Sequence, residues 1–377
     1  MDKINVAVVG LRFGGAFPTI YRDHPNVGSV AICDSDRTVL DSYGDRHGFK
    51  DRFNDYGDLL ASGKVDAIHI VTPLARHVGM SVAALDAGKH CACTVPMAMT
   101  IDGLREVIAA QRRSGRNYMM METAAYTRHY MYVKDMLNAG EMGNVQFLRG
   151  AHYQDLEGWP DYWKGLPPLH YATHAVAPIL GLSGSRAVKV HCFGSGAMRD
   201  ELVANYGNPY PIETAIMKLD KGPLAAEFSR SLFHTARDYV ESFTVLGDRK
   251  SFEWNLEGEN PIVYELLPLN EGSRGSGVRH ERVLLPDYGH LLPEPLRRYT
   301  QYVTVADPNN PHMSTLQGGA HHGSHPHLVH EFVMSVVEGR KPFPDEVTSA
   351  EWCAAGICAH ESAMKGGEGV EVPDFRA

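Results

Sequence analysis

Residues 4–15 read INVAVVGLRFGG, and this stretch decides the fold of the N-terminal part of the chain. The apolar run 4–9 is typical of a buried strand, and a glycine-rich turn follows it at once. Gly10 and Gly15 occupy the first and third positions of a G-x-G-x-x-G pattern. Arg12 stands where a second glycine normally lets a pyrophosphate approach. A strand, such a turn and then a helix predict a dinucleotide-binding unit.

An acidic residue follows the second predicted strand, residues 29–33. Asp34 lies 24 residues beyond Gly10, where a carboxylate accepts hydrogen bonds from the adenine ribose hydroxyls. Because such a carboxylate repels a 2′-phosphate, the sequence favours NAD over NADP. Arg37 moderates that preference, since its charge attracts a phosphate.

Further strands, predicted at 65–71, 90–94 and 117–121, alternate with helices at 78–87 and 101–113. This alternation predicts a doubly wound parallel sheet, which binds ligands at the carboxyl ends of its strands. The predicted cofactor-binding residues are therefore those of the turn and the strand ends: Gly10, Arg12, Phe13, Gly15, Asp34, Arg37, Thr72, Pro73, His77, Thr94, Val95, Pro96 and Glu122.

The texture changes after a helix predicted at 130–139. Strands follow with few helices between them, and short turns such as 247–250 predict a large open antiparallel sheet. The predicted strands are 145–154, 187–194, 211–219, 223–232, 238–247, 250–255, 261–267 and 281–285, and helices at 325–338 and 347–364 end the chain. We therefore expect an α/β Rossmann domain at 1–122. An α+β domain for substrate binding and oligomerisation is expected at 123–377.

Composition excludes several classes of protein. The net charge of −9 over 377 residues argues against a nucleic-acid partner, which needs a basic face. The sequence contains no run of eighteen apolar residues, so no membrane span is predicted. The N-terminus enters a predicted strand at once, so no signal peptide is expected. The six scattered cysteines fit reduced, buried thiols. We expect a cytoplasmic protein.

Three features resemble the glucose-fructose oxidoreductase/inositol dehydrogenase (Gfo/Idh/MocA) family over nearly the whole chain. They are the Rossmann unit, Thr72-Pro73-x-x-x-His77, and Gly88-Lys89-His90 opening a strand that ends at Pro96. The resemblance implies a tightly held NAD(P) and hydride transfer at a sugar or cyclitol carbon. The family's dehydrogenases carry Glu-Lys-Pro where this chain has Thr94-Val95-Pro96. Since valine cannot transfer a proton, the acid–base group must lie elsewhere.

Other motifs resemble the NAD-dependent glycosidases of the same superfamily, which include N-acetylgalactosaminidases and sulfoquinovosidases and also lack the lysine. These motifs are Met121-Glu122-x-x-x-Tyr126-x-Arg128, Tyr153-Gln154 before Asp155-Leu156, Tyr171-Ala172-Thr173-His174, and His322-Gly323-Ser324; His170 stands where the dehydrogenases have Asp. The resemblance implies cleavage by oxidation at C3 of the sugar, elimination across C1 and C2, addition of water, and re-reduction.

That route needs groups that move protons near neutral pH. The predicted catalytic residues are His174, Glu122, Tyr153 and Tyr171. Three of them have a structural alternative: His174 and Glu122 can cap helices, and Tyr153 can pack in the sheet. His152 and Tyr153 are neighbours in a strand, so only one of them can face the cofactor, and Tyr153 is favoured.

The predicted substrate-binding residues are Tyr126, His170, Lys164, Arg230 and His322. Lys164 and Arg230 would neutralise an anionic substituent such as a sulfonate, or they are ordinary surface charges. The histidines around His322 lack cysteine or carboxylate partners, so no metal is expected. The loop 305–324 is interpreted as a lid or as part of the site.

Three hypotheses of function follow. The first is an NAD-dependent glycoside hydrolase, the second a net sugar or cyclitol dehydrogenase, and the third a non-catalytic NAD-binding regulator. A wide sheet face is seldom left in solvent, so we expect a homo-oligomer through the open sheet.

Overall fold

The computed structural model describes residues 3–301, 303–305, 315–317 and 320–376 of the chain. The chain forms two compact units, each built from separate segments. Unit 1 contains residues 1–126 and 287–350, and unit 2 contains residues 127–286 and 351–377. The contiguous division predicted from the sequence differs from this one, because it placed 287–350 with the second domain.

Unit 1 is built on a six-stranded sheet with the order β3-β2-β1-β4-β5-β6, in which all neighbouring strands run parallel. The strands are β1 (Ile4–Val9), β2 (Val27–Cys33), β3 (Arg52–Phe53), β4 (Ala67–Ile70), β5 (His90–Thr94) and β6 (Tyr118–Met121). The helices between them are α1 (Pro18–Asp23), α2 (Arg37–His47), α3 (Tyr56–Ala61), α4 (His77–Asp86) and α5 (Ile101–Ser114). This order confirms the predicted doubly wound sheet.

Local signals explain where these helices begin and end. The Asp36 side chain accepts hydrogen bonds from the backbone at the start of α2, and Thr100 caps α5 in the same way. Gly115, in the left-handed conformation, ends α5. The chain then enters β6, whose four residues are all buried.

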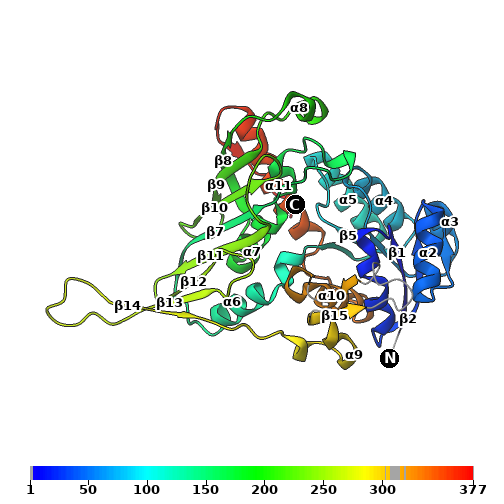
Figure 1. Cartoon of the computed structure of the whole chain (residues 1–377), viewed down its shortest axis with the longest axis horizontal. Coiled ribbons are helices and arrows are strands. Elements are labelled where there is room, and N and C mark those ends of the chain that lie inside the picture. The colour runs from blue at the N-terminus through cyan, green and yellow to red at the C-terminus, as the bar shows by residue number, and fades with distance from the viewer. Residues whose placement is uncertain (1–2, 302, 306–314, 318–319, 377) are drawn as a thin grey trace. The chain divides into compact units, whose positions relative to one another are not determined.

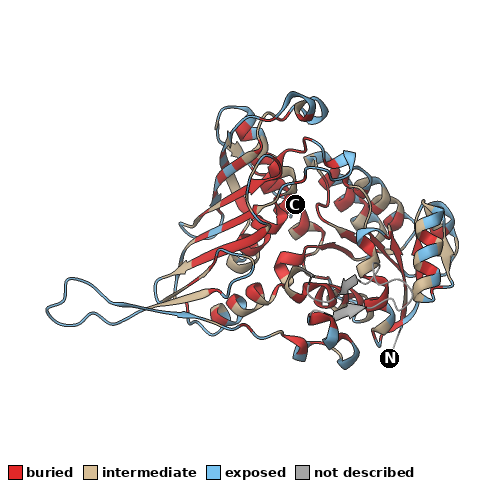
Figure 2. Ribbon diagram, in the orientation of Figure 1, coloured by how far each residue is buried: buried red, intermediate tan, exposed pale blue. Residues whose placement is uncertain are grey.

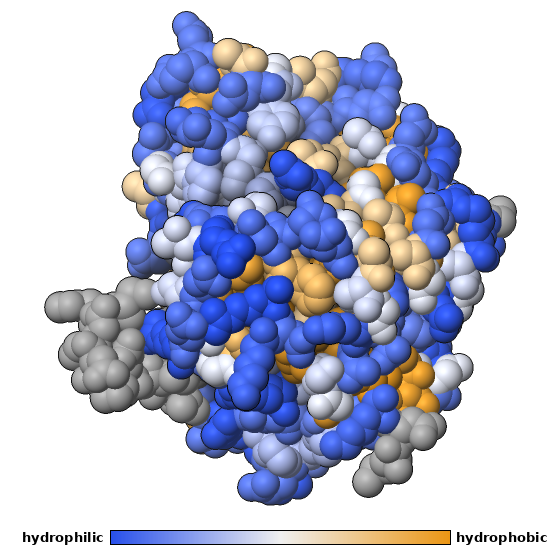
Figure 3. Space-filling model, turned by 90° about the vertical axis from the view of Figure 1, so that its right-hand side faces the viewer, coloured by the Kyte–Doolittle hydropathy of each residue, from blue (hydrophilic) through white to orange (hydrophobic). Residues whose placement is uncertain are grey.

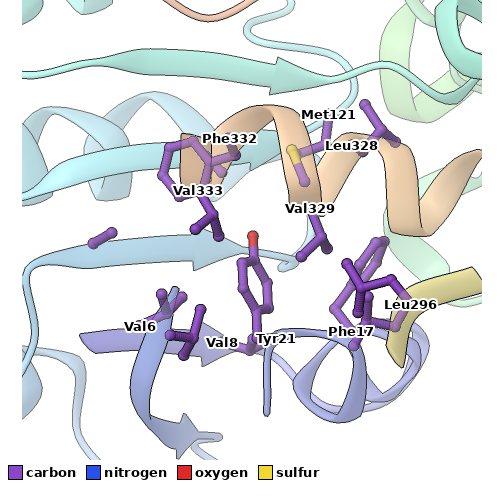
Figure 4. Packing of buried hydrophobic residues seen from close by; sticks show 14 of the residues in the cluster. Val6, Val8, Phe17, Tyr21, Met121, Leu296, Leu328, Val329, Phe332 and Val333 are labelled. Atoms are coloured by element: carbon purple, nitrogen blue, oxygen red, sulfur yellow. The ribbon is translucent and has the colours of Figure 1, made fainter. Parts of the chain in front are cut away.

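The core of unit 1 explains why its segments come from both parts of the chain. Helix α10 (Ser324–Val337) packs Leu328, Val329, Phe332 and Val333 into one cluster with Val6, Val8, Tyr21 and Met121 (Figure 4). A hydrogen bond of 3.0 Å between His24 and His330 joins the loop before β2 to the same helix. The remaining elements here are α9 (Glu294–Arg297), β15 (Val303–Val305) and β16 (Thr315–Gln317).

Unit 2 is built on a nine-stranded sheet with the order β14-β13-β12-β11-β7-β10-β9-β8-β17. Its strands are β7 (Val145–Tyr153), β8 (Ala187–Ser195), β9 (Ile212–Leu219), β10 (Ala225–Ser231), β11 (Val240–Gly247), β12 (Lys250–Trp254), β13 (Ile262–Leu266), β14 (Val278–Arg282) and β17 (Val370–Glu371). The pairings confirm the predicted sheet with one exception, since β7 and β10 run parallel. Strand β14 begins three residues before the predicted 281–285.

The helices of this unit are α6 (Arg128–Asn138), α7 (Thr173–Ser183), α8 (Asp200–Tyr206) and most of α11 (Glu346–Met364). Contacts join α7 to three neighbouring strands, β10, β7 and β11. Figure 1 shows α7 against these strands, and in Figure 2 the central strands are coloured as buried. One face of the sheet is thus closed at its centre by a helix.

The surface and the cysteines agree with a globular chain. Figure 3 shows one face of the molecule, on which hydrophilic residues predominate and hydrophobic ones gather in small separate areas. All six cysteines are buried, as the sequence predicts. Within the described part of the chain, no helix combines the length and the apolar character needed to cross a membrane.

Candidate active site

The glycine-rich turn of unit 1 has no room for a side chain at its first position. Gly10 has a φ of +90°, and a Cβ there would lie 2.1 Å from the carbonyl oxygen of Val71. The turn therefore passes directly over the end of β4, which only glycine permits. It leads into a short 3-10 helix, Phe13–Ala16, and then into α1. This bare turn suits the close approach of a pyrophosphate.

Asp34 lies at the end of β2, beside the same turn. Its carboxylate accepts hydrogen bonds from the backbone N–H of Leu11 at 2.8 Å and of Asp36 at 2.9 Å. The carboxylate thus holds the turn in place, at the position where a ribose is expected. Arg12 pairs with Asp36 at 3.1 Å, and Arg37 pairs with Asp41 at 3.1 Å. Both arginines are exposed and already engaged by carboxylates, which weakens a preference for a 2′-phosphate.

His77 contacts two carbonyl oxygens from a completely buried position. Its Nδ1 lies 2.7 Å from the oxygen of Pro96, and its Nε2 lies 2.8 Å from the oxygen of Thr72. A carbonyl only accepts hydrogen bonds, so both ring nitrogens must donate, and only the imidazolium can do so. Burial lowers the pKa of His77, but the Cys93 side chain and the two carbonyls raise it more, to about 9.

His77 therefore joins the ends of β4 and β5. Thr72 follows β4, and the Thr94-Val95-Pro96 segment ends β5 with a cis peptide bond before Pro96. The Thr94 hydroxyl also donates to the Ile70 oxygen at 3.3 Å. The predicted cofactor-binding residues at these strand ends are thus held as one rigid edge.

Glu122 is completely buried at the carboxyl end of β6. One of its carboxylate oxygens accepts a hydrogen bond of 2.9 Å from the backbone of Ala124. The Thr94–Met121 pairing places it on the strand next to β5, at the same edge of the sheet. Tyr126, a predicted substrate-binding residue, donates its hydroxyl to the Phe343 carbonyl at 2.7 Å.

In unit 2, three charged or titratable side chains lie in one row across the sheet. The strand pairings place Arg230 of β10 and Glu241 of β11 on either side of His152 of β7. Residues that face each other across neighbouring strands share one face of a sheet. All three are buried, with at most 2% of each residue exposed. The cost of burying such groups indicates a functional role.

Helix α7 brings His174 to this row. Gly150 lies two residues before His152, and a Cβ there would be 2.0 Å from the Ala175 oxygen, so the helix backbone rests directly on β7. The ring centroids of His174 and His152 are 4.9 Å apart. His174 Nδ1 lies 3.9 Å from a Glu241 carboxylate oxygen. The second residue of the helix thus completes a buried set of two imidazoles and one carboxylate.

Two tyrosines adjoin this set. Tyr239 donates a short hydrogen bond to Glu241 and lies 5.1 Å from His152, ring to ring. Burial and then the Glu241 carboxylate raise the pKa of Tyr239 well above its usual range, so its phenol stays protonated at neutral pH. Tyr171 lies 5.4 Å from His174 and carries the Arg230 guanidinium 4.8 Å above its ring. We call these six side chains the acid–base cluster: His152, His174, Glu241, Tyr171, Tyr239 and Arg230.

The cluster contains some of the predicted residues and excludes another. His174, Tyr171 and Arg230 are members. Tyr153 is not: it alternates with His152 along β7 and therefore points to the opposite face of the sheet. The structure thus brings His152, not Tyr153, next to His174.

His170 belongs to a neighbouring group instead. Its ring lies 4.8 Å from that of His360, and burial and then His360 lower its pKa to about 3. His360 in turn hydrogen-bonds the buried Glu213 at 2.6 Å, and Glu213 accepts a bond of 3.0 Å from the backbone of Leu169. This group anchors the turn that carries Tyr171.

Two further predicted substrate-binding residues lie outside the cluster. Lys164 is exposed and pairs with Asp161 at 2.7 Å. His322 belongs to unit 1 and adopts a φ of +54°, next to His321 at +46°, a conformation that side chains rarely adopt. Much of the loop predicted at 305–324 lies outside the described residues.

One group of potential metal ligands occurs among the described residues, namely His152, His174 and Glu241. It does not include the histidines around His322. The ligand atoms lie within 4.8 Å of one another. Two ligands of a single zinc ion lie roughly 3.4 Å apart, given bonds of about 2.0–2.1 Å. The wider spacing between His174 and Glu241 suits acid–base chemistry better than coordination.

Sequence reasoning did not single out Tyr239 or Glu241, and it preferred Tyr153 to His152. The available signal was the occurrence of charged side chains within strands predicted to be apolar, especially Glu241 in the alternating stretch that starts β11. That β11 and β10 flank β7 could not be read from the sequence, because the pairing joins segments about 80 residues apart.

Comparison with known proteins defines the class. Residues 4–122 match the family model described as oxidoreductase family, NAD-binding Rossmann fold (GFO_IDH_MocA). The Rossmann order, the bare glycine turn and Asp34 fit the NAD that this family binds. Residues 4–122 therefore carry the NAD-binding Rossmann domain described by this family, and the protein is an NAD-dependent enzyme.

Individual relatives extend the likeness to the whole chain. A glycosyl hydrolase family 109 protein of Streptomyces niveus is 25% identical over 99% of this chain and 78% of its own length. A protein of the same description from Porphyromonas gingivalis is 22% identical over 99% of this chain and 84% of its own. A levoglucosan dehydrogenase structure with NADH and levoglucosan superposes with a TM-score of 0.77, at 18% identity, over 99% of this chain and 100% of its own. That level of identity supports the fold alone.

Proposed function

We propose that the protein is an NAD-dependent glycoside hydrolase that cleaves a neutral glycoside by transient oxidation at C3. The observation that carries the proposal is the acid–base cluster: two imidazoles, a carboxylate and a protonated phenol buried on one face of the sheet of unit 2. The proposal is supported by the 25% sequence identity, over 99% of the chain, to a glycosyl hydrolase family 109 protein. Relatives of this description and the dehydrogenase fold together favour either a glycosidase or a sugar dehydrogenase.

The residues that would hold the cofactor are those at the strand ends of unit 1. The turn at Gly10 accommodates the pyrophosphate, and the strand end at Asp34 accommodates the ribose. Bound NAD⁺ supplies an acceptor for the C3 hydride and, once reduced, the donor that returns it, so the complete cycle consumes no cofactor. The edge held by His77 and the buried Glu122 would position the reactive ring.

His174 would take the proton of the C3 hydroxyl as the hydride leaves. The resulting C3 ketone acidifies the C2 proton, because the negative charge left on removing it is delocalised onto the ketone oxygen. Glu241, flanked by His152, would remove the C2 proton, and the C1–O bond then breaks. Tyr239, whose phenol is protonated at neutral pH, would give its proton to the departing oxygen. Water adds to C1, and the same groups return the protons.

Two features favour a glycosidase over a net dehydrogenase. Val95 stands where the dehydrogenases of the family carry their proton-transferring lysine. The cluster also holds more titratable groups than hydride transfer alone requires, because removing the C2 proton and protonating the leaving group are extra steps.

The charges near the cluster favour a neutral sugar. Arg230 is buried, stacks on Tyr171 and donates to Gln154 at 3.3 Å. Lys164 is paired with Asp161. Both cations proposed to bind an anionic substituent therefore already have partners within the protein.

The test uses nitrophenyl glycosides of neutral hexoses and N-acetylhexosamines in both anomeric forms, with the released phenol and NADH absorbance followed together. Release of phenol without accumulating NADH is the expected result. A primary kinetic isotope effect from deuterium at C2 would distinguish this route from ordinary hydrolysis. His174→Gln and Tyr239→Phe should each reduce kcat by roughly 10²–10⁴-fold. Tyr153→Phe, on the opposite face, is the matched control and should stay within twofold of the parent.

Steady accumulation of NADH without release of phenol would support a net sugar dehydrogenase instead. Neither product across the panel would count against both enzymes. Equal losses in Tyr153→Phe and Tyr239→Phe would remove the assignment of the cluster.

A further inference from the structure

One end of the sheet of unit 2 is an open edge formed by a short charged strand. Strand β14 is the terminal strand of this sheet, and all five of its residues are exposed. Figure 1 shows that the loop between β13 and β14 extends beyond the other strands, and Figure 2 shows its residues as exposed. A strand at an open edge presents backbone donors and acceptors to a further strand. The edge therefore suits the addition of a strand from another chain.

The pairing with β13 fixes which backbone groups of β14 point outward. The Leu267 N–H donates to the Gly277 carbonyl at 2.9 Å, and the Val283 N–H donates to the Pro261 carbonyl at 3.0 Å. The register between these two contacts is regular, so the hydrogen bonds to β13 are made by every second residue, those with odd numbers. The N–H and C=O groups of the three even-numbered residues of β14 therefore point to the open side.

These outward groups match those of a second copy when two β14 strands pair antiparallel about His280. In that register His280 faces its own counterpart and Val278 faces Arg282 of the second copy, so both kinds of pair exchange backbone hydrogen bonds. Arg279 then lies opposite Glu281 of the second copy, and the two-fold symmetry repeats this contact in the other direction. Side chains approach most closely in such non-hydrogen-bonded pairs. The strand is thus complementary in charge to itself.

The charges also select this register among its neighbours. The adjacent registers that keep the hydrogen bonds place Arg279 opposite Arg279 of the second copy, or Glu281 opposite Glu281. Like charges directly opposite each other destabilise a sheet, whereas opposite charges stabilise it. The ion pairs that the arginines already make, Arg279–Glu265 and Arg282–Glu259, lie at the surface, where such pairs contribute little. They therefore do not oppose the pairing of two strands.

Exposed apolar side chains accompany the charged strand. Leu284, just beyond β14, is 85% exposed, while Val278 and its partner on β13, Leu266, are 56% and 52% exposed. In the register about His280, Leu284 of the second copy is the diagonal neighbour of Val278 on the same face of the sheet. Pairing would therefore bury apolar side chains that a single copy leaves in solvent, which favours association.

We propose that two copies of the chain associate through β14, so that the sheet of unit 2 continues from one copy into the other. The homo-oligomer expected from the sequence would then be joined through the edge of the sheet and not through its open face. Because the pairing occupies the β14 edge of both copies, the assembly closes at two copies and does not extend into a fibre. This association does not depend on the proposed glycosidase activity.

Analytical ultracentrifugation of the full chain tests the association, with circular dichroism as the check of folding. The parent should sediment as a dimer. His280→Pro removes an outward N–H that β13 does not use, so this variant should fold and should be monomeric. Ile216→Lys is the matched control, because Ile216 is exposed on β9, on the face of the same sheet, and should leave the dimer intact.

Charge reversal provides an independent readout that does not rely on proline. Glu281→Arg places two arginines opposite each other and Arg279→Glu places two glutamates opposite each other, so each variant alone should raise the dissociation constant of the dimer about tenfold or more. An equimolar mixture of the two variants restores both pairs of opposite charge and should sediment as a dimer. If His280→Pro fails to fold, these variants decide alone. A monomeric parent, an assembly unchanged by His280→Pro or by charge reversal, a mixture that remains monomeric, or a dimer lost in Ile216→Lys would overturn the proposal.

Discussion

The contacts of His77 predict that this buried side chain carries a positive charge at neutral pH. Its pKa in the folded protein is about 9, against 6.5 for an unperturbed histidine. The folded state therefore binds the proton more tightly than the unfolded chain does. The resulting contribution to stability is complete below pH 6.5 and is lost as the pH rises through 9. Because a difference of one in pKa corresponds to about 1.36 kcal/mol, the rise in the pKa of His77 from 6.5 to about 9 contributes about 3 kcal/mol to the free energy of unfolding.

His77→Gln removes the charge but keeps one amide donor for either the Thr72 or the Pro96 carbonyl. Urea unfolding of the whole chain, followed between pH 6 and pH 10, gives the difference in unfolding free energy between parent and variant. That difference should be largest at pH 6 and should shrink by about 3 kcal/mol by pH 10. Groups common to both proteins cancel in it.

Cys93→Ser is the control, because Cys93 is the titratable group that faces His77. In this variant the pH range over which His77 contributes to stability should narrow but persist, since both carbonyl contacts remain. NMR of histidine-selectively labelled protein offers a direct check: His77 should titrate near pH 9, with both ring nitrogens protonated below it. A midpoint near 6.5, or a stability difference that does not vary with pH, would refute the reasoning.

Three further predictions concern other parts of the protein. Gly10→Ala forces a Cβ into a backbone carbonyl, and its affinity for NAD, measured by calorimetry, should fall roughly 100-fold. Gly48→Ala is the control, because Gly48 has a similar φ but its Cβ would lie in open space, so this variant should bind NAD normally. Equal losses of affinity in the two variants would contradict the steric argument. Glu213→Gln disrupts the pair with His360 and should lower kcat about tenfold at unchanged KM, because the turn beside the acid–base cluster loosens. A change in KM alone would contradict a role of this pair in positioning the cluster. Burial and then His330 lower the pKa of His24 to about 4, so the folded chain should lose stability as the pH falls from 6.5 to 4. Other buried histidines such as His170 titrate over a similar range, so His24→Gln should reduce this loss of stability without abolishing it. An unchanged profile would exclude this pair.

The predicted cofactor-binding residues of unit 1 follow closely from the sequence. Gly10, Asp34 and Glu122 stand at the ends of strands whose apolar runs are continuous, and consecutive strands of such a sheet pair by simple rules. The acid–base cluster of unit 2 depends on information that is not local. Whether His152 or Tyr153 lies beside His174 depends on which face of β7 the helix α7 covers. Nothing in the sequences of β7 and α7 indicates that face.

The errors in the fold have similar causes. The terminal helices looked like part of the domain that precedes them, but α10 carries an apolar face that fits the sheet of unit 1. Strand β14 begins three residues earlier than the sequence predicts, because its residues are mostly charged and all exposed and show no apolar alternation. Short strands such as β17, with two residues, pair only because the neighbouring strand β8 is already in place.

The packing of α10 against the sheet of unit 1 has a consequence for synthesis on the ribosome. The first 126 residues leave the exit tunnel almost two hundred residues before Ser324 does, so β1 and its neighbours wait without the helix that covers Val6 and Val8. During that interval the nascent sheet presents an apolar face to its surroundings. A chaperone that binds such faces would find this protein as a client at that stage, and a gene truncated before residue 324 would yield a product prone to aggregation.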